Sequence, residues 1–424
     1  MDLKGKKLLI LGGTTLVGHI IEAAKAMGVY TICTDYILNA PAKAFADKSY
    51  DVSVLDEDAI YELAIREDVD GVFTGYADIV LGPCARVCQR LNLPFYATVE
   101  QLQATMNKIN FKANCRKHGI NAATDVPFEL FSDPKQYDKI QFPIIVKPAD
   151  SYSNRGITVV HRAAELEQAI KYAIDTSPTR QYLVEEYIYG DDIYMYYTVQ
   201  NGYLSLSAMA DRLSSDSQYG KAPLPIVYFF PSKYTQLCLT TLVPKLQAMI
   251  SDLEIKNGSF FVQGFVVENQ IVVFEMGFRL SGSAGYLVIK HASGVDQVSM
   301  HVRYALTGEY TGWDLRELDN PDFSTPHCSI VVVLSAGLIS KIEGINEIKN
   351  LPNVFNLVQL LHVGDRVEST GTLKQQFAKI YLSAENTSAL KDDIRFIRDT
   401  LKITDEMGQS MILDLFDPDS MVFQ

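Results

Sequence analysis

A glutamine, a glutamate and an arginine stand in a strongly apolar part of the chain. Gln263 lies in the run SFFVQGFVV, Glu275 lies in the run IVVFEM, and the residues ENQ separate the two runs. Aromatic and β-branched residues around a polar turn predict a β-hairpin. Carboxylate and amide oxygens on neighbouring strands suit Mg²⁺, and Arg279, which follows, suits a transferring phosphate. A hairpin with one polar face and a surface ion pair stays an alternative.

A second candidate site begins where a predicted strand ends. Lys147 closes the strand FPIIVKP, and a polar loop at residues 150–157 follows it. Backbone N–H groups of such a loop can cradle phosphate oxygens. The candidate ligands in the loop are Ser151, Ser153, Arg155 and Gly156. An edge-strand lysine that discourages aggregation, followed by an ordinary turn, is the alternative interpretation.

The order of these signals along the chain resembles the ATP-grasp superfamily. The signals are Lys108 in MNKINFK, then Lys147, the acidic stretch LVEEYIYGDD, and finally Gln263 with Glu275 and Arg279. The resemblance covers roughly residues 5 to 310. Within the superfamily, the chain resembles carboxylate–amine ligases such as L-amino acid ligases, and also biotin carboxylase and carbamoyl phosphate synthetase.

The resemblance implies where ATP would bind. Lys108 and Lys147 would contact phosphates, whereas Lys112, one helical turn after Lys108, would belong to a solvated face. The loop at 150–157 would cover the β- and γ-phosphates, and Arg279 would be the catalytic residue that stabilises the transferring phosphoryl group.

The acidic stretch would hold the adenosine part of ATP. Glu185 would lie near the adenine amine, and backbone groups near Tyr187 and Ile188 would bind the base edge. Asp192 stands where the family commonly has a glutamate for the ribose hydroxyls. A solvated turn is the alternative interpretation of these acidic residues.

Two departures from the family pattern concern the metal. The usual run is E-x-N-x-R, and here Gly277 replaces the asparagine that often ligates a second metal. Gln263 replaces a glutamate, as it does in carbamoyl phosphate synthetases. Gln263 and Glu275 are therefore predicted to hold Mg²⁺, with Mn²⁺ as an alternative, and the number of metal ions stays open.

The predicted fold class is a multidomain α/β and α+β protein. Strand and helix patterns alternate through residues 1–105, which predicts a Rossmann-like parallel sheet with helices on both faces. A two-lobed ATP-grasp domain at 106–310, with a lid at about 120–190, and a smaller C-terminal α+β domain at 311–424 should follow. The turn Gly12–Gly18 with Asp35 could serve NAD, but a tight turn without nucleotide is the preferred interpretation.

The composition excludes several classes of protein. The 424 residues are 47% hydrophobic, which favours a large core over disorder, and the net charge of -13 disfavours general nucleic-acid binding. The six cysteines are scattered, which favours reduced thiols, and no apolar run approaches a membrane span. We expect a cytoplasmic protein without nucleic-acid or membrane partners, and a homodimer is an open alternative to a monomer.

The resulting hypothesis is an ADP-forming carbon–nitrogen ligase whose substrates are a small carboxylate and an amine. The carboxylate would attack the γ-phosphate of ATP, and the amine would displace phosphate from the acyl phosphate. Arg212 and Lys221 are candidates for holding the carboxylate. Three alternatives stay open: a bicarbonate-activating enzyme like biotin carboxylase or carbamoyl phosphate synthetase, a nucleotide-binding module that has lost catalysis, and an NAD-dependent oxidoreductase.

Overall fold

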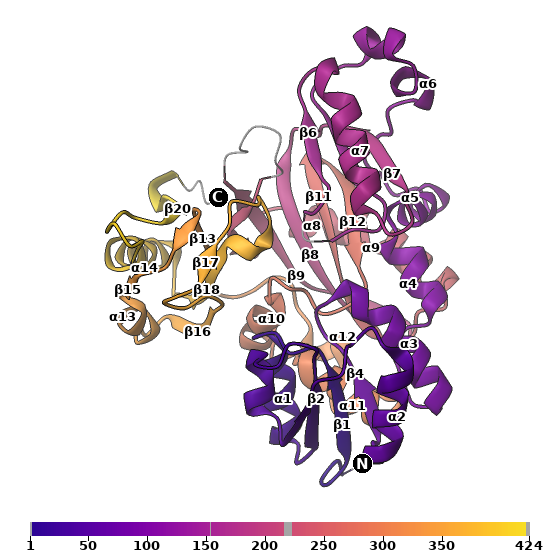
Figure 1. Ribbon diagram of the computed structural model, residues 1–424, viewed down its shortest axis with the longest axis vertical. Helices are drawn as coiled ribbons and strands as arrows, with labels where there is room; N and C mark the ends of the chain where they lie inside the picture. The colour runs from indigo at the N-terminus through magenta and orange to yellow at the C-terminus, as the bar shows by residue number, and fades with distance from the viewer. Residues whose placement is uncertain (1, 153, 216–222, 421–424) are drawn as a thin grey trace.

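The N-terminal part of the chain folds as a parallel sheet between helices, as the strand–helix alternation predicts. The computed structural model describes residues 2–152, 154–215 and 223–420, and its first sheet has the order β3-β2-β1-β4. The elements are β1 (Lys7–Leu11), α1 (Val17–Ala26), β2 (Tyr30–Thr34), β3 (Lys48–Tyr50), α2 (Glu57–Glu67), β4 (Gly71–Phe73) and α3 (Asp78–Leu91). Strands β1 and β2 are apolar and buried because helices cover both faces of the sheet (Figure 1).

The tight turn after β1 is closed by the protein's own chain. Asp35 accepts hydrogen bonds from the backbone N–H groups of Gly13, at 2.8 Å, and Ile37, at 2.9 Å. A Cβ atom added at Gly13 would lie 2.4 Å from the Cβ of Ala40. The segment after β2 therefore packs onto the turn, and the carboxylate expected at a ribose in an NAD site binds backbone instead.

Two helices, α4 (Val99–Met106) and α5 (Lys108–Lys117), lead from this sheet into the centre of the molecule. The two helices are separated at Asn107, and α5 begins at Lys108. Asn107 caps it, because its side-chain oxygen accepts from the N–H groups of Ile109 and Asn110. Lys108 is therefore the first residue of α5.

A small antiparallel sheet with a helix packed on it follows, and we call residues 144–186 the lid. Its strands have the order β6-β5-β7, and an apolar core of its own includes Ile144, Leu166 and Val184. The elements of this region are α6 (Phe128–Phe131), β5 (Ile144–Pro148), β6 (Thr158–Val160), α7 (Leu166–Thr176) and β7 (Tyr182–Glu186). The lid stands at the top of Figure 1, at the far end from the N-terminal sheet.

A nine-stranded sheet joins the central part of the chain to the C-terminal part. Its order is β12-β11-β8-β9-β10-β13-β18-β16, and β20 pairs with β13. The strands are β8 (Asp191–Gln200), β9 (Tyr203–Ser214), β10 (Pro225–Phe230), β11 (Gly258–Val267), β12 (Gln270–Gly277), β13 (His327–Leu334), β16 (Val354–Gln359), β18 (Gln376–Ser383) and β20 (Ile412–Asp414). The sheet thus continues across residue 310, because β10 and β13 pair directly.

The predicted hairpin is confirmed as β11 and β12. Its turn residues, Glu268 and Asn269, both have positive φ, of 47° and 62°, as a tight two-residue hairpin requires. The register places Gln263 directly opposite Glu275. Side chains at such a pair lie close together, so the hairpin brings the two predicted metal ligands to one place.

Two helices, α8 (Thr235–Thr241) and α9 (Val243–Asp252), precede the hairpin. Pro244 lies in the first turn of α9, where its missing N–H costs nothing, and it cannot continue the preceding helix. After the hairpin come α10 (Gly285–Ser293) and α11 (Gln297–Thr307), and α11 packs on α1 and β4 of the N-terminal sheet.

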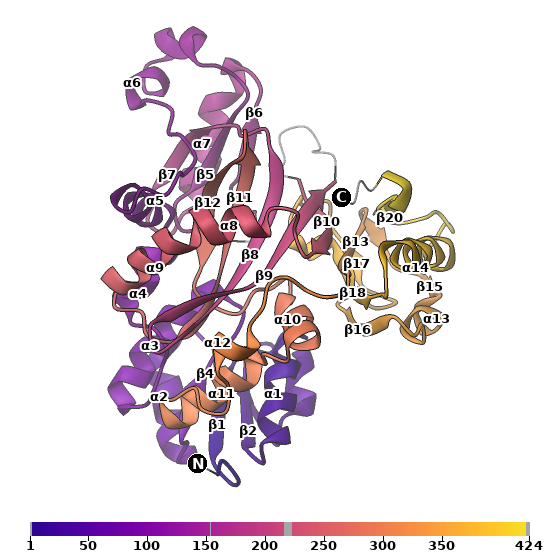
Figure 2. The ribbon, with the colours of Figure 1, turned by 180° about the vertical axis from the view of Figure 1, so that it is seen from behind.

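The C-terminal strands carry helices on their outer side, as Figure 2 shows for α13 and α14. The remaining helices and strands are α12 (Leu315–Leu318), β14 (Gly337–Leu338), β15 (Lys341–Glu343), α13 (Ile345–Lys349), β17 (Arg366–Val367), α14 (Thr387–Thr400) and β19 (Lys402–Thr404). Short 3₁₀ turns lie at Pro41–Phe45, Pro134–Lys139, Ala163–Glu165, Leu373–Gln375 and Pro418–Ser420. Across the described ranges, no helix combines the length and the apolar character needed to cross a membrane.

Candidate active site

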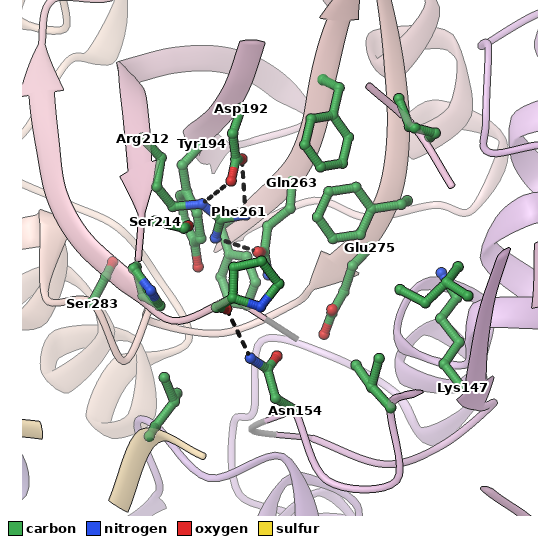
Figure 3. Close-up of a pocket in the computed structure, with 18 of the residues that line it drawn as sticks. Lys147, Asn154, Asp192, Tyr194, Arg212, Ser214, Phe261, Gln263, Glu275 and Ser283 are labelled. Atoms are coloured by element: carbon green, nitrogen blue, oxygen red, sulfur yellow. Dashed lines mark hydrogen bonds and ion pairs between the residues drawn. The ribbon is translucent and has the colours of Figure 1, made fainter. Parts of the chain in front are cut away.

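A cavity of about 620 Å³ is lined by the lid, the hairpin, β8, β9 and the C-terminal strands (Figure 3). Its wall includes ten of the predicted site residues: Lys108, Lys147, Ser151, Glu185, Tyr187, Ile188, Asp192, Gln263, Glu275 and Arg279. Motifs separated by as many as 171 residues, from Lys108 to Arg279, therefore share one site. Ser153 and Lys221 lie outside the described residues.

Of the two predicted metal ligands in the hairpin, Glu275 is accessible, whereas the side-chain oxygen of Gln263 is already bound. The side chain of Glu275 is 27% exposed, and its nearest cation is Lys108, with 3.9 Å between Oε1 and Nζ. Gln263 Oε1 instead accepts a hydrogen bond from Nη1 of Arg212 at 2.6 Å (Figure 3). Because a guanidinium only donates, the amide oxygen of Gln263 must face Arg212 in this arrangement, and it does not face a metal.

The space beside Gly277, where the family commonly has an asparagine side chain, is filled by an aromatic ring. A Cβ atom at Gly277 would lie 2.2 Å from Cζ of Phe261, the residue opposite it in the hairpin. The Phe261 ring stacks on Tyr194, with 5.2 Å between ring centroids. Glycine at this position therefore follows from core packing, and no side-chain ligand fits there unless Phe261 moves.

These residues fit a magnesium ion held by Glu275 together with substrate phosphates. Mg²⁺ is commonly bound by one or two carboxylates plus phosphates and water, so a single glutamate is sufficient. Among the described residues, no cluster of three or more histidine, cysteine or acidic side chains could hold a metal by itself. A second metal ion would have to take its ligands from substrate and water.

The predicted catalytic arginine is held by the first residue of α3, in the N-terminal part of the chain. Arg279 binds Asp78 through two contacts, Nε to Oδ1 at 2.7 Å and Nη2 to Oδ2 at 2.6 Å, and donates to the Leu280 carbonyl. Its guanidinium lies 5.1 Å above the Phe261 ring. Burial disfavours the charged form, but Asp78 outweighs this effect and raises the pKa of Arg279. The guanidinium is thus fixed in charge and orientation.

The lysine at the end of β5 shares a buried carboxylate with a second lysine. Lys147 Nζ lies 2.5 Å from Oε2 of Glu185, and Lys112 Nζ lies 2.7 Å from Oε1. Burial lowers the pKa of Lys147, and Glu185 opposes that shift. Lys112, expected on a solvated face, is buried and also pairs with Asp125. Glu185, expected near the adenine amine, thus binds the two lysines. Of the two lysines, Lys147 lines the cavity and Lys112 does not.

The loop after β5 lies partly in the cavity wall. Lys108, which is buried, donates from Nζ to the Ser151 carbonyl at 2.9 Å. Arg155 and Gly156, two predicted phosphate ligands, do not line the cavity. A Cβ at Gly156 would lie 2.8 Å from Pro148, so this glycine is required by packing and by its positive φ of 79°. Asn154, which the sequence interpretation missed, does line the cavity (Figure 3).

The segment between β7 and β8 brings the predicted adenosine residues to the cavity. Tyr187 and Ile188 lie outside both strand ladders, so their backbone groups are not committed to a sheet. Asp192 pairs with Arg212, with Nε to Oδ2 and Nη2 to Oδ1 both at 2.9 Å. Burial raises the pKa of Asp192, and Arg212 opposes the rise. The predicted ribose ligand and the candidate carboxylate ligand Arg212 therefore neutralise each other.

The sequence interpretation missed several cavity residues. They are Asp78, Tyr194, Tyr228, Ser283, Gln376 and Lys379. Asp78 alone had a usable local signal, because it follows the carboxyl end of β4, the edge at which ligands bind in parallel α/β sheets. The others are ordinary strand or turn residues whose role depends on which strands meet at the cavity.

The lid and the hairpin lie in a part of the chain that matches a known domain. Residues 140–286 match the model of the ATP-grasp domain. The formate-dependent phosphoribosylglycinamide formyltransferase of Sulfurisphaera tokodaii is 25% identical over 310 residues, which is 71% of this chain and 76% of that protein.

Two solved structures share the fold over nearly the whole chain. The L-amino acid ligase of Bacillus licheniformis has a TM-score of 0.78 at 19% identity and covers 95% of this chain and 99% of its own. The biotin carboxylase domain dimer of the Hydrogenobacter thermophilus 2-oxoglutarate carboxylase, in complex with MgADP and bicarbonate, has a TM-score of 0.76 at 17% identity. It covers 94% of this chain and 90% of its own. The chain therefore contains an ATP-grasp domain at residues 140–286 and shares the overall fold of these two structures.

Proposed function

We propose that this protein activates a small carboxylate as an acyl phosphate and joins it to an amine, with release of ADP and phosphate. The observation that carries the proposal is the convergence of Glu275, Lys108, Lys147 and Arg279 on one cavity. One accessible carboxylate for a metal–phosphate complex among three cations is the charge pattern that phosphoryl transfer requires.

The proposed reaction has two steps. A carboxylate oxygen attacks the γ-phosphorus of ATP, an O–P bond forms, and the bond to the β-phosphate oxygen breaks with its electron pair leaving on ADP. The amine nitrogen then attacks the carbonyl carbon, the C–O bond to phosphate breaks, and the nitrogen loses a proton. The protein's part is positioning and charge stabilisation, so no covalent enzyme intermediate is needed.

The cavity residues divide between the parts of ATP in this proposal. Lys108 and Lys147 bind phosphates. Glu275 holds Mg²⁺, which neutralises phosphate charge when bound, and Mn²⁺ is an alternative because it takes the same oxygen ligands. Arg279, oriented by Asp78, stabilises the charge that develops on the phosphoryl group.

The adenosine contacts are a separate part of the proposal. The free backbone of Tyr187 and Ile188 binds the adenine edge, and Asp192 lies at the ribose end. This placement rests on the position of Tyr187 and Ile188 between the lid and β8 and of Asp192 at the start of β8, where all three line the cavity.

The names of the similar proteins indicate which carboxylates to test. They name formate, L-amino acids and bicarbonate. We propose measuring ADP release with formate, acetate, butyrate, benzoate, bicarbonate and the standard L-amino acids, each with hydroxylamine as the amine. The expected result is acid-dependent ADP release with formation of the matching hydroxamate.

The control omits the acid and measures background ATP hydrolysis. ATP binding without acid-dependent ADP release would contradict the ligase proposal and favour a nucleotide-binding module. ADP release with bicarbonate alone, increased by biotin, would favour the bicarbonate-activating alternative.

Because one solved structure of similar fold is described as a domain dimer, we also propose a homodimer, which sedimentation equilibrium would test.

A further inference from the structure

One buried lysine in the cavity has no part in the site described so far. Lys379 lies on β18 of the C-terminal strands, is 5% exposed, and lines the cavity with Gln376, Val331 and Leu373. Among the described residues, no acidic side chain pairs with it, and its one hydrogen bond goes to the carbonyl of Gly282. An ammonium group has three protons, so this contact leaves two donors and a full charge unsatisfied.

The location of Lys379 separates it from the phosphate-binding lysines. Its acceptor Gly282 precedes Ser283, and Figure 3 shows Ser283 and Lys147 at opposite sides of the cavity. The nearby turn is already fastened by other bonds: Tyr381 Oη donates to the Ser283 carbonyl, and Tyr196 Oη lies 2.8 Å from Ser283 Oγ. The turn therefore does not need a buried charge to hold it.

Burying an uncompensated charge is costly, and proteins retain such a group where a ligand supplies the opposite charge. The neighbours Val331 and Leu373 are apolar, whereas Gln376 adds an amide to the same wall. One positive charge beside an amide and apolar side chains suits a monoanion carried on an apolar body. We propose that Lys379 and Gln376 form the binding site for the substrate carboxylate. This proposal deepens the proposed function and rests on it for the role of the bound acid.

The environment also fixes the range of pH over which Lys379 is charged. Burial lowers the pKa of Lys379 to about 8. Tyr381, two residues along the same strand, has its pKa raised by burial and stays neutral near that pH. Carboxylate binding should therefore weaken as the pH rises through about 8, because the ammonium loses its proton.

Equilibrium dialysis of labelled benzoate into the full chain saturated with MgADP tests the proposal without requiring turnover. Benzamide, which has the same body and no charge, is the ligand control. Lys379→Met should weaken benzoate binding about tenfold or more, whereas Tyr381→Phe, which removes the neighbouring bond to the same turn, should change it by less than about threefold. Lys379→Arg should retain binding above pH 8, where the native protein loses it.

Three results would overturn the proposal. They are no benzoate binding by the native protein, equal binding by Lys379→Met, and an equal loss in Tyr381→Phe, which would show that both residues only fasten the turn. Tighter binding of phenyl phosphate than of benzoate would overturn the carboxylate class. If benzoate binds as predicted but no acid supports ADP release, the ligase proposal fails while this site stands.

Discussion

The basic side chains of the cavity differ sharply in their partners. Arg279, Arg212 and Lys147 each contact a carboxylate at 2.9 Å or less. Lys108 reaches its nearest carboxylate only at 3.9 Å, and Lys379 has none among the described residues. The first group is held in place by its counter-ions, whereas the second group retains positive charge that an incoming anion can neutralise.

The difference in partners separates two roles of a cation: holding a fixed orientation and attracting an anion. A carboxylate that binds a guanidinium at two points fixes its plane, as Asp78 does for Arg279, but it also cancels most of its long-range charge. A buried lysine without such a partner is less stable alone and gains more from a bound anion. Arg279, which is held at two points, is therefore suited to a reacting group, and the unpaired lysines are suited to binding substrate charge.

The largest effect is expected from Glu275, whose nearest cation, Lys108, is 3.9 Å away. Glu275→Gln keeps the size of the side chain and removes its charge, so kcat should fall on the order of a hundredfold or more because the metal–phosphate complex loses its protein ligand. Glu268→Gln, at the tip of the same hairpin, is the matched control. Normal turnover of Glu275→Gln at limiting Mg²⁺ would place the metal elsewhere.

Lys147 and Lys112 both bind Glu185, so a lysine in the cavity wall can be compared with one outside it. Lys147→Ala should weaken ATP binding about tenfold to a hundredfold, through the loss of roughly 1.5–3 kcal/mol from one charge-assisted contact. Lys112→Met removes the other partner of Glu185. Because Lys112 lies outside the cavity wall, this change should lower stability without a comparable change in ATP affinity. Calorimetry with ATP measures the affinity of each variant, and equal losses of affinity in the two would contradict the assignment of Lys147 to ATP binding.

Removing an orienting carboxylate should have a smaller effect than removing a charge. Asp78→Asn leaves Arg279 charged but loses the two-point ion pair, so kcat should fall about tenfold while ATP affinity stays close to that of the native protein. Steady-state kinetics combined with ATP calorimetry separates the two quantities. An unchanged kcat would show that Asp78 only stabilises the fold at this position.

The smallest effect concerns stability at the hairpin. Gly277→Asn should lower the free energy of unfolding by about 1–3 kcal/mol, because the new side chain meets the Phe261 ring. In the Phe261→Ala background the ring is absent. Adding Gly277→Asn there should therefore lower the free energy of unfolding by less than it does in the native protein. Urea unfolding measures this coupling, and an additive result would argue against the ring as the obstacle.

Much of this site could be predicted because its signals are local. The hairpin, Lys147 at the end of a strand and the alternation of the N-terminal sheet all follow from short patterns that pair with their neighbours in sequence. The break before Lys108 was also predictable, since asparagine is a preferred helix cap. The same is true of the break before Pro244.

The rest depends on contacts between distant segments. Asp78 and Arg279 are 201 residues apart, and Arg212 reaches Gln263 across 51 residues. No local pattern states that a guanidinium will occupy the amide oxygen of Gln263, or that Phe261 will fill the space beside Gly277. Lys379 likewise reads as an ordinary strand residue until β18 joins the sheet beside β13.

The most direct test of the ligase account follows an oxygen atom. The acid that gives the highest ADP release is prepared with ¹⁸O in its carboxylate and turned over with ATP and hydroxylamine. If the carboxylate attacks the γ-phosphate, one ¹⁸O atom passes to inorganic phosphate in each turnover, and mass spectrometry of the phosphate should detect it. Phosphate without ¹⁸O, released at the same rate as the hydroxamate, would exclude the acyl phosphate and contradict the account.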